Sequence, residues 1–205
     1  SFCFLRTQKM KRLIDIAISF AGLVLLSPLF LLLIILVKTA SPGPAFYKSE
    51  RVGKEGRRFK MLKFRTMVVG ADKMGGPSTA SDDARLTKIG CFLKKFQLDE
   101  LPQLINVLKG EMSLVGPRPE VPFYVNMMTE EEKSIILSVR PGMTDLASLW
   151  NFHEGEILKG SPDPEKTYQE EIRPKKLELQ RKYVQKKSLL LDLKIVLKTI
   201  GKIFK

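Results

Sequence analysis

The longest apolar stretch of the 205-residue chain covers residues 13–37 and contains few polar positions. At ~1.5 Å per residue, a straight helix over residues 16–37 would be about 33 Å long, enough to cross the hydrocarbon core of a bilayer. Ser27-Pro28 falls near its middle. Proline removes an amide donor and clashes with the preceding turn, so the pattern predicts a break there between two arms, each reaching about half the hydrocarbon depth.

Both flanks of this apolar stretch are basic. The positive-inside rule places such flanks on the cytoplasmic side, and a re-entrant membrane helix-break-helix over residues 1–40 satisfies the rule at both ends. A full single span is the main alternative. A cleaved signal peptide fits less well because no small-residue cleavage site follows, and a buried helix of a soluble protein is the remaining interpretation. The flanking cations are Arg6, Lys9, Lys11 and Arg12 before the stretch, and Lys38, Lys48, Arg51, Lys54, Arg57 and Arg58 after it.

A short alternating pattern follows the apolar stretch. Residues 41–44, Ser-Pro-Gly-Pro, form a helix breaker. Residues 45–51 and 58–66 then have the character of two short strands, the second with an alternating pattern, and Gly53 and Gly56 lie between them. The spacing predicts two strands joined as a small β-hairpin.

The rest of the chain predicts helices joined by loops, so the expected fold class is α+β and mainly α. Residues 41–205 are expected to form one domain after the membrane segment of residues 1–40. Capping residues, glycines and prolines set the expected boundaries. Helices are expected from Ser81 to about Lys95, from Asp99 to Gly110, over Glu130–Leu137 and from Glu165 to about Gln185, with loops at 70–81, 117–122 and 151–164.

The C-terminal segment, Ser188–Lys205, has an amphipathic helical pattern. One face carries lysines, and bulky apolar residues fill the rest, which suits a helix lying in a membrane interface. An ordinary helix packed on a core is the alternative interpretation. The lysines are Lys194, Lys198, Lys202 and Lys205, and the apolar residues are Leu190, Leu193, Ile195, Val196, Leu197, Ile200, Ile203 and Phe204.

The composition indicates that the protein binds an anionic partner. Lys and Arg outnumber Asp and Glu by 35 to 22, which gives a net charge of +13. Nucleic acid, anionic lipid headgroups or a phosphorylated substrate would each fit that charge. The two cysteines, Cys3 and Cys91, form no metal-binding spacing and indicate neither a disulfide framework nor a zinc site. Cys91 is expected to be a small core residue on a helix.

Two adjacent carboxylates, Asp99 and Glu100, stand at an expected helix start. On a helix their side chains diverge by about 100°, so they suit separate roles rather than a shared proton. One could face a reacting centre while the other orients it or holds a metal, and the helix N-terminus would favour nearby phosphate. Taken alone, this local pattern is more typical of simple helix capping.

The motif Pro117-Arg118-Pro119 fixes an arginine between two prolines. Such a guanidinium loses little entropy on binding and can hold a phosphate in a bidentate manner, although a structural salt bridge is the plainer interpretation. Other cations are more typical of a solvated face or a headgroup contact than of catalysis. They are Arg51, Lys63, Arg65, Lys94 and Lys95. The common nucleotide-binding and hydrolase motifs are absent from the sequence.

Several motifs in this order resemble the bacterial sugar transferase family, the small monotopic phosphoglycosyl transferases. The resemblance covers nearly the whole chain and outweighs the capping interpretation. It rests on Lys11-Arg12, Ser27-Pro28, Pro42-Gly43-Pro44, Phe46, Arg51-Val52-Gly53, Lys63-Phe64-Arg65-Thr66-Met67, Leu98-Asp99-Glu100-Leu101-Pro102-Gln103, Asn106-Val107-Leu108-Lys109-Gly110-Glu111-Met112-Ser113, Gly116-Pro117-Arg118-Pro119 and Arg140-Pro141-Gly142.

The resemblance implies an activity at the cytoplasmic face of a bacterial cytoplasmic membrane. A phosphosugar would pass from a UDP-sugar to polyprenyl (undecaprenyl) phosphate with Mg²⁺, through a covalent intermediate on Asp99, at a site surrounded by amphipathic interfacial helices. Glu100 would help to handle metal or proton, and both carboxylates are candidate metal ligands. The partners would be these substrates and membrane lipids rather than nucleic acid, and apolar surface could pair two subunits as a homodimer. The implied substrate-binding residues are Lys63, Arg65, Lys94, Pro117, Arg118 and Arg140.

Three positions depart from the commoner pattern of that family. Asp145 and Ser148 stand where many members have glycine and glutamine, and Lys94 stands where an arginine is frequent. If the segment with Asp145 contacts the donor, the sugar preference would differ. A non-catalytic membrane-surface module that binds anionic lipid or nucleic acid through its charge is the alternative function.

Overall fold

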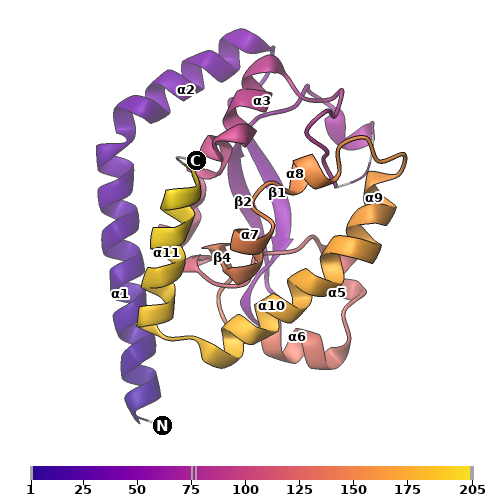
Figure 1. The fold of residues 1–205 in the computed structure, drawn as a ribbon. Helices are drawn as coiled ribbons and strands as arrows, with labels where there is room; N and C mark the ends of the chain where they lie inside the picture. The colour runs from indigo at the N-terminus through magenta and orange to yellow at the C-terminus, as the bar shows by residue number, and fades with distance from the viewer. Residues whose placement is uncertain (1, 75, 77, 204–205) are drawn as a thin grey trace.

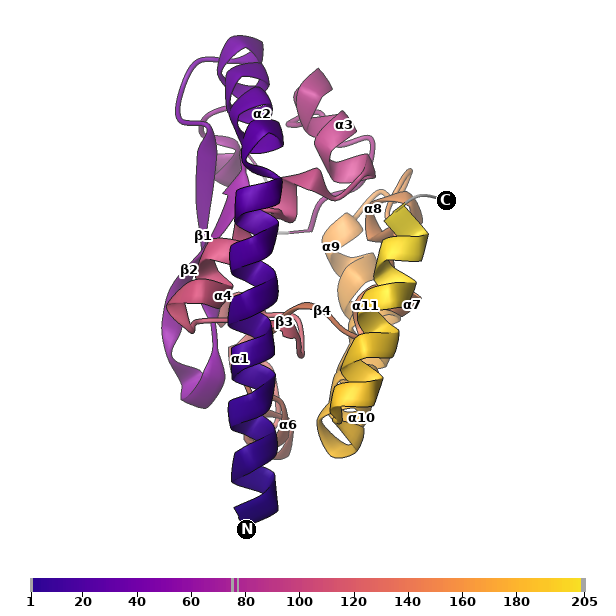
Figure 2. The same ribbon diagram turned by 90° about the vertical axis from the view of Figure 1, so that its left-hand side faces the viewer.

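The computed structural model describes residues 2–74, 76 and 78–203, with side chains from residue 7 onward. The fold is mainly helical and contains two small sheets, which confirms the expected α+β class (Figure 1). Helices α1 and α2 lie along one edge of the molecule, and the remaining elements pack to one side of them (Figures 1 and 2).

The expected break in the N-terminal apolar stretch is present. Helix α1 (Phe2–Leu25) and helix α2 (Ser27–Ala40) meet at Leu26 and are bent by 63°. Pro28 occupies the first turn of α2, where its missing amide costs nothing. Within the described residues, neither helix alone is long and apolar enough to cross a membrane, whereas the bent pair together has the length and composition of a broken span or a re-entrant loop.

The first half of α1 packs against the rest of the protein through polar contacts. Arg12 donates to the carbonyls of Val107 and Leu108 at 2.6 and 3.0 Å. The buried carboxylate of Asp15 accepts from the Ser113 hydroxyl at 2.8 Å. Lys11 is ion-paired with Asp192, near the other end of the chain. The expected domain boundary near residue 40 stays a prediction. These contacts join the expected membrane segment, residues 1–40, closely to the expected domain of residues 41–205.

The predicted hairpin is present within one or two residues of its expected ends. Strands β1 (Phe46–Val52) and β2 (Arg58–Phe64) are antiparallel and joined through the 3₁₀ turn η1 (Lys54–Gly56). The register sets Lys63 opposite Tyr47 and Arg51 opposite Phe59. Residues directly opposite each other share one face of the sheet, so both cations lie on the same face of the hairpin.

A second sheet was not predicted. Strands β3 (Ser113–Val115) and β4 (Gly142–Thr144) pair in parallel, with Ser113 opposite Gly142. The backbones approach so closely that a Cβ at Gly116 would lie 2.5 Å from the Arg140 carbonyl oxygen. This pairing brings the segment that contains Arg118 against the segment that follows Arg140.

The helix expected from Ser81 to about Lys95 starts later than predicted. Helix α3 covers Lys88–Lys95 and is capped by the Thr87 hydroxyl, which accepts from the Gly90 amide at 2.9 Å. The expected cap failed because Asp83 is engaged by Arg85 instead. Cys91 is on a helix as expected but is exposed, which contradicts the predicted core position, because α3 buries the face that carries Gly90 and Leu93.

The helix expected over Asp99–Gly110 is divided. A 3₁₀ turn, η3 (Leu98–Glu100), precedes helix α4 (Gln103–Lys109), and Gly110 ends α4 in the left-handed conformation with φ 86°. Gln97 also has a positive φ of 53°, so the chain turns sharply immediately before the acidic pair. The carboxylates therefore lie on a tight turn rather than on the first turn of a continuous helix.

Helix α6 (Glu130–Ile136) confirms its prediction, with a capping box between Thr129 and Glu132. Four short helices were not predicted: η2 lies in the first expected loop, α5 begins at the end of the second, α7 precedes the third and α8 lies within it. The long charged helix after Glu165 is present in three parts, and the C-terminal amphipathic segment is helical. These elements are η2 (Ala71–Lys73), α5 (Pro122–Asn126), α7 (Leu146–Trp150), α8 (Glu154–Ile157), α9 (Pro164–Thr167), the π-helix η4 (Tyr168–Ile172), α10 (Arg173–Lys186) and α11 (Leu189–Ile203).

Candidate active site

The two carboxylates of η3 are both buried, with their side chains only 7% and 14% exposed for Asp99 and Glu100. Strand β2 supplies Lys63, and the loop after β3 supplies Arg118. Three segments that are distant in sequence therefore meet at one point. The structure brings together Asp99, Glu100, Lys63 and Arg118, as the sequence led us to expect.

Glu100 is held by two cations. The Lys63 ammonium donates to its Oε1 at 2.7 Å, and the Arg118 guanidinium donates to both carboxylate oxygens, at 2.9 Å for Oε2. Burial alone would raise the pKa of Glu100, but the charges of Arg118 and Lys63 outweigh it and hold the pKa far below its usual range. Glu100 is therefore a permanent carboxylate that fixes both cations.

Asp99 is in the opposite state. Its carboxylate lies 3.9 Å from the Lys63 ammonium, beyond hydrogen-bonding distance. Burial raises the pKa of Asp99 to about 6, and the attraction of Lys63 only partly offsets it. The buried Asp99 carboxylate is thus not hydrogen-bonded to a cation, whereas the adjacent Glu100 carboxylate is bonded to two. A nucleophile needs its oxygens free, as those of Asp99 are.

Lys94 is on α3, and its charge acts on the same carboxylate. Its side chain is half-buried. Burial lowers the pKa of Lys94, the nearby charge of Lys63 adds to this, and Asp99 opposes it. Lys63 and Lys94 thus lie near Asp99, and two cations at that position would neutralise the charge of a phosphate brought up to the carboxylate.

The Arg118 loop is held from several sides. The fully buried Asp145 accepts from the Arg118 amide at 3.3 Å, and Gln180 donates to the Arg118 carbonyl at 3.3 Å. The Val52 amide donates to the Glu120 carbonyl at 3.0 Å and thereby fastens the loop to the end of β1. Asp145, noted in the sequence only as a departure, therefore has a defined role in positioning the Arg118 backbone.

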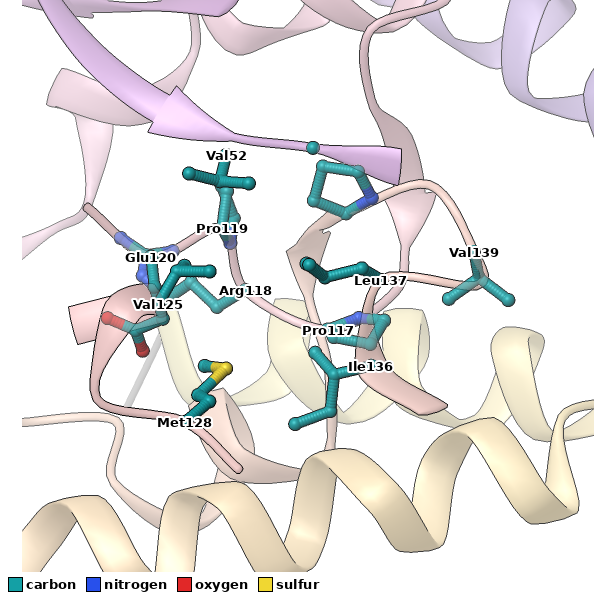
Figure 3. Close-up of a pocket in the computed structure, with 12 residues that line it drawn as sticks. Val52, Pro117, Arg118, Pro119, Glu120, Val125, Met128, Ile136, Leu137 and Val139 are labelled. Atoms are coloured by element: carbon teal, nitrogen blue, oxygen red, sulfur yellow. The ribbon is translucent and has the colours of Figure 1, made fainter. Parts of the chain in front are cut away.

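Figure 3 shows the pocket beneath this loop. Its volume is about 10 Å³, room for roughly one water molecule, so it supports the loop rather than receiving a substrate. Pro117 lines this pocket and is not among the contacts of Glu100. The other lining residues are mostly apolar and come from β1, α5, α6, the residues that follow each of them, and the Arg118 loop: Val52, Gly53, Arg118, Pro119, Glu120, Val125, Met128, Ile136, Leu137, Val139 and Pro141.

Arg65 and Arg140 are placed elsewhere. The buried guanidinium of Arg65 donates to the carbonyls of Ser41 and Pro42 at 2.7 and 2.5 Å and so closes the C-terminal end of α2. Arg140 donates to the Gly110 carbonyl at 2.9 Å. The structure therefore gives both arginines contacts to backbone and does not bring them to the acidic pair, because helix ends and turns leave carbonyls that a guanidinium can satisfy.

The carboxylates at the pair offer few free oxygens for a metal ion. No group of three or more His, Cys, Asp or Glu side chains able to hold a metal occurs among the residues that the structure describes. Mg²⁺ commonly uses only one or two carboxylates together with phosphate oxygens and water. Asp99 has free oxygens for such a role, whereas those of Glu100 are bonded to Lys63 and Arg118.

The carboxylates of Asp99 and Glu100, with Lys63 and Arg118 beside them, form a site suited to phosphate-group transfer. The family model of the bacterial sugar transferases matches residues 6–205, and the chain belongs to this family. The chain is 38% identical to the exopolysaccharide production protein ExoY of Sinorhizobium fredii, over 93% of this chain and 83% of that protein.

Two longer relatives carry names that specify substrates. The chain is 37% identical, over 93% of its length, to the UDP-N-acetylgalactosamine-undecaprenyl-phosphate N-acetylgalactosaminephosphotransferase of Aeromonas hydrophila. It is 38% identical, over 95% of its length, to the UDP-glucose:undecaprenyl-phosphate glucose-1-phosphate transferase of Klebsiella pneumoniae. The matches span 42% and 40% of those two proteins.

Proposed function

We propose that this protein transfers a sugar 1-phosphate from a UDP-sugar to undecaprenyl phosphate as the first membrane step of glycoconjugate assembly. The names of the related transferases support this choice of substrates. The observation that carries it is the contrast within the acidic pair: Glu100 is fixed by Lys63 and Arg118, while the buried Asp99 next to it is not. A site with one anchored and one free carboxylate suits phosphoryl transfer through a covalent intermediate.

Asp99 would act first. One of its carboxylate oxygens attacks the phosphorus that carries the sugar, a new aspartyl oxygen–phosphorus bond forms, and the diphosphate bridge breaks. UMP leaves with the electron pair of the broken bond. An oxygen of undecaprenyl phosphate then attacks the same phosphorus, which forms the lipid diphosphate sugar and returns Asp99 to a free carboxylate. Lys63 and Lys94 lie close enough to Asp99 to balance the negative charge of the phosphate in both steps.

Magnesium would assist at the same place. We assign Asp99, with Glu100 beside it, as the protein groups nearest to the metal, and diphosphate oxygens would complete the coordination. The ion would polarise the diphosphate and stabilise the departing UMP. Glu100 would meanwhile keep Lys63 and Arg118 in position, because its oxygens already accept from both.

Because undecaprenyl phosphate is a membrane lipid, this chemistry would take place at a membrane surface, and we propose the cytoplasmic face. We propose that α1 and α2 form a re-entrant hairpin, supported by the 63° bend and by the exposed apolar residues beyond the packed part of α1. Helix α11 would lie in the interface, where its outer face exposes apolar side chains and Lys194 and Lys198 flank them. The exposed apolar residues are Phe20, Val24, Leu25, Leu31, Leu32 and Ile35 of the helix pair, and Leu190, Leu193, Leu197 and Ile200 of α11.

Cysteine labelling tests the hairpin. Lys9→Cys and Lys48→Cys place thiols at exposed positions on the two sides of the bent pair, in a background with Cys3→Ser and Cys91→Ser. A membrane-impermeant reagent added outside intact cells should label neither site, and should label both after lysis. Labelling of one site from outside would reject the re-entrant arrangement in favour of a span.

Release of UMP tests the reaction. The full chain in nanodiscs is given undecaprenyl phosphate, Mg²⁺ and a panel of UDP-sugars, beside Asp99→Asn and the matched surface variant Asp82→Asn. We expect UMP from at least one donor, abolished by Asp99→Asn and kept by Asp82→Asn. Turnover that survives Asp99→Asn would refute the covalent mechanism. No UMP from any donor, with vesicle binding that weakens as salt rises, would favour the non-catalytic lipid-binding module instead.

A further inference from the structure

Arg51 lies next to the candidate active site but is not used by the contacts described so far. It shares a face of the hairpin with Lys63, as the register of β1 and β2 requires. The next residue, Val52, donates its amide to the Glu120 carbonyl at 3.0 Å, so the end of β1 runs directly beside the Arg118 loop. The backbone of Arg51 is therefore next to the loop that carries Arg118, and the charge of Arg118 acts on Arg51.

The charge of Arg51 is poorly compensated. Its Nε is buried and has no hydrogen-bond partner, and the structure records no ion pair to its guanidinium within the described part of the chain. Glu120 is the nearest acidic influence, but its carboxylate is already paired with the Lys176 ammonium at 3.4 Å. Burial lowers the pKa of Arg51, Glu120 opposes this, and the like charge of Arg118 adds to it. A buried cation in this state gains free energy when an anion arrives.

Arg51 is also on a particular side of the acidic pair. Lys63 is opposite Tyr47, four residues before Arg51 on the same face of the hairpin, whereas Arg51 adjoins Val52, which is bonded to the Arg118 loop. Glu100 accepts from both Lys63 and Arg118, so it lies between Lys63 and the loop beside Arg51. A phosphate attacked by Asp99 would lie near Lys63 and Lys94, and the next phosphate along a diphosphate would lie beyond Glu100.

We propose that Arg51 binds the phosphate that stays with the nucleoside, so that it holds the donor before transfer and the nucleoside monophosphate after it. This inference rests on the proposed function, because it takes the ligand to be a nucleoside diphosphate sugar. Lys63 and Arg118 are committed to Glu100, whereas Arg51 has its guanidinium free to form two charge-assisted bonds to phosphate oxygens.

Binding of UMP to the full chain in nanodiscs, measured by calorimetry, tests this assignment. The variants are Arg51→Gln, Arg51→Lys and the control Arg57→Gln, which removes the same group from an exposed position on the same hairpin. We expect the Kd for UMP to rise about 10- to 100-fold in Arg51→Gln and less in Arg51→Lys, which keeps the charge but loses the two-pronged geometry. Arg57→Gln should bind UMP like the parent protein.

Two further readouts separate binding from a structural role. Thermal unfolding without ligand should be no earlier in Arg51→Gln than in the parent, because an unpaired buried charge is removed, whereas a structural ion pair would show a clear loss of stability. Uridine binding should be unchanged. Equal UMP affinity in Arg51→Gln, or an equal loss of uridine and UMP affinity, would overturn the proposal.

The same experiment separates the two hypotheses. If the parent protein releases UMP in the turnover assay and Arg51→Gln binds UMP normally, only the role of Arg51 is wrong. If the parent neither turns over donors nor binds UMP, the proposed function and the role of Arg51 both fail.

Discussion

Asp99 and Glu100 are consecutive residues, yet their surroundings drive their acidities apart. Glu100 accepts from Lys63 and Arg118, while Asp99 receives no comparable anchor and is kept from water. Groups whose pKa values are pushed apart in this manner commonly divide a chemical task. Because the pKa values of the two carboxylates differ, we expect pH to affect both the reaction rate and the stability of the protein.

Formation of the covalent intermediate should depend on the ionised form of Asp99. Because burial raises the pKa of Asp99 to about 6, the ionised fraction falls as the pH drops below that value. We expect the single-turnover rate of UMP release, measured without lipid acceptor, to fall about tenfold per pH unit below pH 6. Omitting the acceptor avoids titration of its own phosphate, and a rate that is constant down to pH 5 would contradict the assignment.

The stability of the protein should also depend on the raised pKa of Asp99, but it should fall where the reaction rate rises. The folded-state pKa of Asp99, about 6, is above its ordinary value of 3.8, so the folded protein binds the proton more tightly. The contribution of Asp99 to stability is present at low pH and is lost as the pH rises through about 6. Two units at ~1.4 kcal/mol each make the cost of its charge on the order of 3 kcal/mol at pH 8.

Asp99→Asn should remove that cost. We expect it to raise the free energy of unfolding in detergent at pH 8 by up to this amount, although it abolishes turnover. The gain should shrink toward pH 4, where the parent carboxylate is protonated. Asp82→Asn, at an exposed position, serves as the control, and a destabilised Asp99→Asn at pH 8 would show that the carboxylate is better accommodated than we infer.

At the scale of elements, Gly90 fixes how α3 meets the end of β2. A Cβ at Gly90 would fall within 2.6 Å of the Thr66 carbonyl carbon, and no flexible side chain is involved that could yield. Helix α3 carries Lys94 and leads to the turn that bears Asp99. The close approach therefore sets the distance between the cationic and acidic parts of the site.

Gly90→Ala should be destabilising in spite of the better helix propensity of alanine. We expect a loss of about 1–3 kcal/mol from the forced displacement, together with slower UMP release, measured by denaturant unfolding and by the turnover assay. The control is Gly201→Ala in α11, where an added Cβ meets nothing within 4 Å and alanine should be neutral or favourable. Equal effects of the two substitutions would contradict the packing argument.

Local patterns predicted the elements that depend on local information. The β1–β2 hairpin follows from alternation and two glycines, and the helix break follows from Pro28. The β3–β4 pair was missed because its strands have three residues each and pair across a long separation, Ser113 with Gly142. Nothing in a three-residue stretch specifies a partner so far along the chain.

The site was predicted in part for a related reason. Asp99, Glu100, Lys63, Lys94 and Arg118 do converge, and the resemblance to a family named them. The sequence alone, however, does not show which arginine guanidinium already has hydrogen-bond partners within the protein. Arg65 looked like a phosphate ligand but serves backbone carbonyls, while Arg51 looked like a solvated cation and lies unpaired beside Arg118.

At the scale of the whole molecule, α1 and α11 are joined through a small polar network. Lys11 is ion-paired with Asp192 and also donates to the Val115 carbonyl at 2.9 Å, while the Tyr183 hydroxyl donates to Asp192 at 2.7 Å. The Asp192 side chain is 12% exposed and that of Lys11 is 28% exposed. Removing one charge from such a pair leaves the other poorly solvated.

A double-mutant cycle tests this network. We expect Lys11→Met and Asp192→Asn each to lower the free energy of unfolding by about 2 kcal/mol, and the double variant to lose clearly less than the sum. The measurement is denaturant unfolding in a mild detergent. Strict additivity of the two substitutions would mean that the pair contributes nothing to holding α1 against α11.

That same contact has a consequence for how the protein is made. Lys11 and Asp192 are 181 positions apart in the chain. Translation adds roughly 5–20 residues per second, so α1 must wait about 10–40 s after its own synthesis before its partner residue exists. During that interval the most apolar part of the chain has been made while its polar anchor is missing. If the helix pair enters a membrane as proposed, it would do so before it docks, and α11 would then secure α1.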